Sequence, residues 1–249
     1  MTVHISGKVF GVELTDELRG IVREPTALFF SIVMPVAFFG LFVSLFGKFS
    51  SGGLSAGTTM VATFGAFGVV SVVLMNPGIG VAADRERGWL RAKQVSAVPI
   101  GVTLAAKVVA ALPYAAGVLL AMTATAAVTG ALDAPVTALL RILAVLMVGA
   151  LPFALLSLAV GFQTGAGAAT AVLNAILIPS AVLSGLWMPL EIMPAFFGDI
   201  APFLPTYHLA RLALAQLTGA PVLTHVLVLL GTTIVAAALA ALSYRHARS

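Results

Sequence analysis

The chain has 249 residues, of which 60% are hydrophobic and 9% charged, and its formal net charge is +4. Soluble domains are typically about 45–50% apolar and about 25% charged, so this composition excludes an ordinary soluble domain and predicts an integral membrane protein. Basic residues fall at the ends of apolar runs and form no surface stripe, which argues against nucleic-acid binding. Without cysteine, the chain has no disulfides, thiolate metal sites or cysteine nucleophiles.

The N-terminal residues 6–22 repeat apolar side chains at helical spacing, with charged side chains on the opposite face. This pattern predicts an amphipathic helix that lies in the membrane interface. A surface helix of a soluble domain is the alternative, and it is disfavoured because Arg23-Glu24-Pro25 leads directly into an apolar run. The first 25 residues contain four carboxylates and no apolar core, so we expect no cleavable signal peptide.

Six apolar segments reach the roughly 20 residues that a transmembrane helix needs. We therefore expect an all-α integral membrane fold that forms a single transmembrane domain over residues 1–249. Ten of the 13 Lys and Arg residues fall on the side of the N-terminus, which places both termini in the cytoplasm of a multi-pass protein. The expected spans are residues 26–47, 57–82, 102–130, 137–162, 167–188 and 222–243.

The segment 189–220 precedes the last expected span and combines several prolines with apolar and aromatic residues. It is too apolar for a solvated loop and too interrupted for a span. Irregular backbone at membrane depth survives only inside protein or around a cavity. We therefore expect short re-entrant helices that enter from the outer face; a proline-rich cap on the outer surface is the alternative.

Charge is concentrated between the second and third expected spans, where residues 84–93 hold six of the chain's 22 charged residues. A polar stretch between two long apolar runs has to lie in water, where it can contact another protein. A solvated loop without a partner is the alternative. The charged residues are Asp84, Arg85, Glu86, Arg87, Arg91 and Lys93.

Several kinds of chemistry are absent from the sequence. No G-x-x-x-x-G-K-[ST] motif is present, so the chain has no such phosphate-binding loop. The four histidines are scattered without metal-ligand spacing, and we expect no metal, cofactor or catalytic residue. No carboxylate lies in the middle of a span, which argues against coupling to protons or sodium, and Lys107 is expected to extend to the cytoplasmic interface.

Uncharged polar and aromatic residues within the spans are candidates for a substrate path. Asn76-Pro77-Gly78 predicts a kink late in the second span, and Gly161-x-x-x-Gly165 permits close helix approach. Hydrogen bonding or packing between helices is the alternative role for each of these residues. The candidate path residues are Phe64, Phe67, Met75, Asn76 and Asn174.

Three motifs, in this order, resemble the membrane subunit of ABC type-2 exporters over essentially the whole chain. The first is the N-terminal interfacial helix with Arg23-x-Pro25 and Pro35. The second is Glu86-Arg87-Gly88-x-Leu90, followed by Pro99 and Lys107. The third is Ser184-Gly185 with Pro189, Pro194 and Pro205-Thr206-Tyr207. The sequence departs from the family pattern at Trp89 and at Lys93-Gln94.

The resemblance implies two copies of the permease, expected to be a homodimer in the bacterial plasma membrane, joined to two ABC ATPase subunits that bind ATP and Mg. Residues 84–98 would form a coupling helix that contacts the ATPase, and the substrate exported would be hydrophobic or amphipathic, such as a drug, antibiotic or lipid. Three alternatives remain. The chain could export a polysaccharide or lipid-linked glycan, it could be a non-transporting sensor or immunity protein, or it could be a secondary transporter. The implied coupling residues are Asp84, Arg85, Glu86, Arg87, Gly88, Leu90, Arg91 and Lys93.

Overall fold

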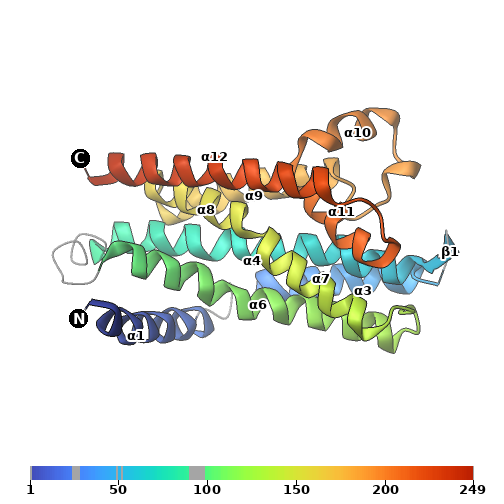
Figure 1. The fold of residues 1–249 in the computed structure, drawn as a ribbon, viewed down its shortest axis with the longest axis horizontal. Coiled ribbons are helices and arrows are strands. Elements are labelled where there is room, and N and C mark those ends of the chain that lie inside the picture. Colours follow the sequence, from blue (N-terminus) through green and yellow to red (C-terminus); the bar gives the residue numbers. More distant parts are fainter. Residues whose placement is uncertain (1, 24–28, 49, 52, 90–98, 249) are drawn as a thin grey trace.

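The computed structural model describes residues 2–23, 29–48, 50–51, 53–89 and 99–248, which form a helical bundle (Figure 1). Within these residues, five helical segments are long and apolar enough to cross a membrane. They are α4 (Ala56–Glu86), α6 (Ile100–Val128), α7 followed by α8 (Val136–Gly149 and Leu151–Gln163), α9 (Ala166–Leu183) and α12 (Leu223–Arg248).

The chain begins with α1 (Thr2–Val22), which packs along α6. The first expected span, 26–47, consists of a π-helical stretch η1 (Phe29–Val33) and the 13-residue helix α3 (Met34–Phe46); residues 24–28 lie outside the described ranges. The described residues therefore give five full-length spans and the shorter α3. A count of six spans remains a prediction.

Helix α4 is the centre of the bundle and is buried along almost its whole length. It packs against α3, α6, α8, α9 and α11 (Figure 1). Glycine permits a close contact with α8, because Gly161 of α8 lies against the backbone of Gly78 in α4, with no room for a Cβ. The close approach that the glycine spacing suggested thus occurs between these two helices.

The fourth expected span, 137–162, is divided into two helices. Helix α7 ends at Gly149, Ala150 connects it to α8, and Pro152 lies in the first turn of α8. Proline is tolerated there because the first amides of a helix have no intrahelical acceptor. The fifth expected span, 167–188, is also shorter than expected, since α9 ends at Leu183 before a turn at Gly185 (φ +68°).

The segment before the last helix contains η2 (Leu190–Ile192), α10 (Ala195–Ile200), η3 (Ala201–Phe203) and α11 (Pro205–Thr218). Helix α10 stands apart from the bundle, whereas α11 packs against α4, α7 and α12 (Figure 1). Residues His208, Leu209 and Ala213 of α11 are buried there. The segment is therefore not only a cap, since one of its helices contributes to the core.

Both chain termini lie at the same end of the bundle, which we call the terminus end (Figure 1). The opposite end, which we call the far end, carries a short hairpin of β1 (Ser50–Ser51) and β2 (Leu54–Ser55) that leads into α4. Ser55 is the N-cap of α4, and its hydroxyl accepts a hydrogen bond of 3.2 Å from the Thr58 amide. This cap satisfies one of the free amides at the start of the helix.

Asp133, in the loop between α6 and α7, ties that loop to the N-terminus of α4. Its carboxylate accepts hydrogen bonds from the Thr58 hydroxyl and from the Ser55 amide, the latter at 2.9 Å. Its own amide donates to Thr58 Oγ1 at 2.9 Å. The Thr58 hydroxyl, and then the Ser55 donors, hold the pKa of Asp133 below its ordinary value of 3.8, because they stabilise the charged form.

Candidate substrate cavity and its charged end

A cavity of about 930 Å³ runs along one side of α4 and is the candidate functional site. Its walls come from α1, α3, α4, α6, α9 and the turn that follows α9. Four of the five candidate path residues line it, namely Phe67, Met75, Asn76 and Asn174. Phe64 does not; it is fully buried and packs its ring against Phe39 and Phe42.

Aromatic rings form the part of the cavity wall nearer the far end. Trp187 packs edge-on against Phe67, with ring centroids 5.1 Å apart, and its centroid lies 5.7 Å from that of Phe38. The indole Nε1 of Trp187 is buried and has no hydrogen-bond partner among the described residues. This wall therefore offers a large apolar surface to a ligand.

Uncharged polar side chains line the middle of the cavity. Ser71 and Asn76 come from α4, and Thr170 and Asn174 come from α9. The Asn174 amide donates to the Thr170 carbonyl at 2.9 Å and lies 3.9 Å from the Met75 sulfur. The stronger hydrogen bond of Asn174 is therefore within α9, and its contact with α4 is a weak interaction with the Met75 thioether.

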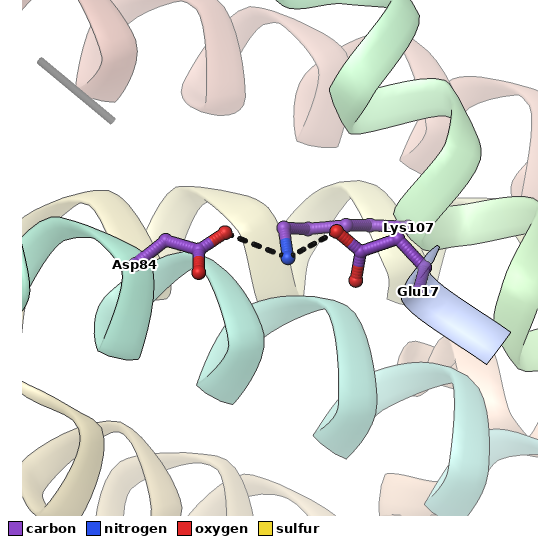
Figure 2. Close-up of polar contacts among 3 residues, drawn as sticks. All are labelled: Glu17, Asp84 and Lys107. Carbon is purple, nitrogen blue, oxygen red and sulfur yellow. Dashed lines mark ion pairs between the residues drawn. The ribbon is translucent and has the colours of Figure 1, made fainter. Parts of the chain in front are cut away.

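The end of the cavity nearest the termini is charged and brings three helices together (Figure 2). The Lys107 ammonium on α6 lies 2.7 Å from Glu17 Oε1 on α1 and 2.8 Å from Asp84 Oδ2 on α4. We call these three residues the lysine triad. All three line the cavity, and the Lys107 side chain is only 5% exposed.

The Lys107 side chain is buried at this end of the cavity. It crosses the surface of Gly80, where a Cβ would lie 3.4 Å from Nζ. A buried ammonium requires ionic partners because desolvation of an unpaired charge is costly. Those partners come from Glu17, 90 positions earlier in the chain, and from Asp84.

The expected coupling helix 84–98 is described only at its start. Asp84, Arg85 and Glu86 form the last turn of α4, so they do not begin a separate helix. Arg87 and Gly88 (φ +71°) form a turn, and both are exposed, as is Trp89. Three of the residues that the family resemblance implied lie outside the described residues: Leu90, Arg91 and Lys93.

Two of these residues contact the hairpin between α8 and α9. The Arg85 guanidinium donates to the Phe162 carbonyl at the C-terminus of α8, and the Glu86 carboxylate lies over Gly165. A cation at a helix C-terminus is stabilised by the partial negative charge there. The next residue of α8, Gln163, contacts α12, because its side-chain amide donates a hydrogen bond of 2.8 Å to the Ser243 carbonyl. Asp84 and Arg85 thus both make contacts with other helices of the same chain, Asp84 with Lys107 of α6 and Arg85 with Phe162 of α8.

A histidine pair joins α11 and α12, and no pattern in the sequence predicted it. His208 Nδ1 of α11 lies 2.9 Å from His225 Nδ1 of α12, and His208 Nε2 lies 2.8 Å from the Pro202 carbonyl. This pair joins three segments of the chain. Among the described residues, no group of three or more metal-ligating side chains occurs, and the pair is best explained as a polar contact between helices.

The bundle of long apolar helices defines a multi-pass membrane protein. Residues 9–218 match the ABC-2 type transporter family, so the chain belongs to that family. A Bacillus subtilis (strain 168) protein named "Putative transport permease YvfS" is 23% identical over 216 residues, which cover 86% of this chain and 88% of that protein. The chain is therefore a transmembrane subunit of an ABC transporter and is not itself catalytic.

Proposed function

We propose that the chain is the membrane subunit of an ATP-driven exporter for a hydrophobic or amphipathic substrate. The observation that carries this proposal is the cavity beside α4, which has aromatic rings at one end and charged side chains at the other. Its volume of about 930 Å³ falls in the range of pockets that hold drug-sized ligands. An amphipathic molecule would place its apolar part against Phe67 and Trp187 and its polar part towards Asn76.

The energy source in this proposal is a separate ABC ATPase, which holds ATP and Mg. The terminus end of the bundle faces the cytoplasm, and the segment 84–98 contacts the ATPase there. Arg87 and Trp89 are exposed at that end, which supports this placement. An exposed tryptophan beside charged residues is typical of a protein interface.

We further propose that two copies of the chain assemble with two ATPase subunits. Thr170 and Asn174 line the cavity and are exposed on the surface of α9. Polar side chains at membrane depth favour a protein or water environment over lipid. A second copy placed against α9 would cover them. In this assembly η1 and α3 complete a sixth span, and α11 is the re-entrant helix of the outer segment.

Export of a polysaccharide or lipid-linked glycan is the second candidate within the same family. A long polymer would require a continuous channel between the two copies of the proposed assembly. The cavity of about 930 Å³ within one chain is the size expected for a small amphipathic molecule.

The test is purification of the chain from native membranes, identification of the ATPase that accompanies it, and reconstitution of both in vesicles. We expect ATP-dependent accumulation of rhodamine 6G or of an NBD-labelled phospholipid in inside-out vesicles. The double variant Arg87→Glu, Arg91→Glu should abolish both ATPase association and transport, while Arg245→Glu, an exposed change on α12, should preserve them.

Two results would favour the other functions. Absence of any ATPase from the native complex would point to a sensor or immunity protein. Transport that stops when an ion gradient is collapsed, with ATP still present, would point to a secondary transporter.

A further inference from the structure

Helix α1 forms part of the cavity wall at the terminus end. Glu17, Gly20 and Ile21 of α1 line the cavity, facing the last turns of α4. Helix α1 packs on α6, the Tyr114 hydroxyl donates a hydrogen bond of 3.0 Å to the Leu18 carbonyl, and the lysine triad adds the Glu17–Lys107 ion pair. Release of Glu17 would therefore loosen this wall of the cavity.

The lysine triad also connects the two ends of the segment that follows α4. Asp84 lies in the last turn of α4, and Lys107 lies in the second turn of α6, which begins after that segment. A displacement of the segment by a partner would thus act on the Asp84–Lys107 contact. Because the same ammonium also holds Glu17, the displacement would reach α1.

We propose that Lys107 is a positioning residue that holds α1 across the cytoplasmic end of the cavity, so that α1 is the entry gate for substrate. The position of α1 at this end of the cavity follows from the lysine triad and the cavity lining alone. Its role in admitting a substrate from the cytoplasm rests on the proposed function.

The three side chains have distinguishable roles in this gate. One ammonium is shared by two carboxylates, so removal of Lys107 leaves two neighbouring negative charges that repel each other. Removal of Glu17 eliminates the ion pair between α1 and Lys107 and leaves the Asp84–Lys107 pair intact. Glu17→Ala is therefore the cleaner variant, and it keeps the proposal testable if Lys107→Met does not fold.

The absence of cysteine from the chain makes the test direct. A single cysteine placed at Asn76, inside the cavity, is labelled with a charged, membrane-impermeant methanethiosulfonate in inside-out vesicles without ATP. We expect Glu17→Ala and Lys107→Met to raise the labelling rate by about tenfold or more, because an open state of low population becomes the major one. Asp16→Ala, an acidic neighbour on α1 that does not line the cavity, should leave the rate unchanged.

A cysteine at His246, exposed on α12, serves as the control for vesicle orientation and should react equally in all backgrounds. An unchanged rate at position 76 in Glu17→Ala, or an equal increase in Asp16→Ala, would overturn the gate. Labelling that responds as expected in a protein without ATP-driven transport would retain the gate and refute the proposed function instead.

Discussion

Gly161 of α8 rests on the backbone of Gly78 in α4, and this contact sets the distance between the two helices. A methyl group at position 161 would overlap the Gly78 carbonyl, so the helices would have to separate. We expect Gly161→Ala to lower the free energy of unfolding by about 1 to 3 kcal/mol, as overpacking in a dense core does. Thermal unfolding in detergent measures this effect.

Gly167→Ala is the matched control for that prediction, because a Cβ at Gly167 would meet no atom within 4 Å. The two glycines are six positions apart, one on each side of the turn between α8 and α9. Equal unfolding temperatures for the two variants would refute the role given to the Gly78–Gly161 contact.

Asp133 provides a prediction about pH. Because the pKa of Asp133 is lowered in the folded protein, its charged form contributes stability above the ordinary pKa of 3.8, and that contribution is lost as the pH falls through the lowered value. Asp133→Ala should therefore lower the unfolding temperature at pH 7 and have a smaller effect at strongly acidic pH. Asp199→Ala, at an exposed position on α10, is the control. A pH-independent difference would contradict this assignment.

Removing the N-cap at the same end of α4 should have a related effect. Ser55→Ala eliminates the acceptor for the Thr58 amide, and loss of such a cap typically costs about 1 kcal/mol. The double variant with Asp133→Ala should cost less than the sum of the two single variants, because both residues act on Thr58. Strict additivity, measured by thermal unfolding, would indicate that the two contacts are independent.

Variants at Phe64 and Phe67 are expected to have different effects, the first on stability and the second on substrate binding. Phe64 is enclosed by other rings and lies away from the cavity, so Phe64→Ala should destabilise the protein by about 3 to 5 kcal/mol. Phe67 lines the cavity, and Phe67→Ala should raise the half-saturating concentration of rhodamine 6G by about tenfold, equal to about 1.4 kcal/mol of lost apolar contact. Transport kinetics and thermal unfolding of both variants distinguish these roles.

Arg85 is predicted to stabilise the C-terminus of α8. Arg85→Met removes the guanidinium from the Phe162 carbonyl, and a partly buried cation at a helix C-terminus contributes up to about 2 kcal/mol. Arg19→Met, at an exposed position on α1, should change stability little. The prediction fails if the two variants unfold at the same temperature.

The sequence predicts the long helices well because their length and apolar character follow from the bilayer itself. Segment 57–82 corresponds to α4 and 102–130 to α6, each with ends that differ by a few residues. The short α3 and the division at Ala150 were not predicted, because an apolar run carries no signal for where a helix is interrupted.

The site was harder to predict for a related reason. Helix α4 is apolar on all sides, so no amphipathic pattern indicates which of its faces borders a cavity, and Phe64 was assigned to the path together with Phe67. The partners of Lys107 could not be foreseen because Glu17 lies far away in the sequence and its pairing depends on how α1 packs. His208 and His225 meet for the same reason, across two helices.

The burial of α4 restricts how this protein can change shape. A helix enclosed by neighbouring helices along its length cannot slide or tilt alone without opening voids on one side and clashes on the other, since packed interiors shift between discrete arrangements. Movement that begins at its last turn must therefore be shared by whole groups of helices. The conformational cycle of this subunit is then expected to consist of a few rigid bodies rotating about α4, with little bending of individual helices.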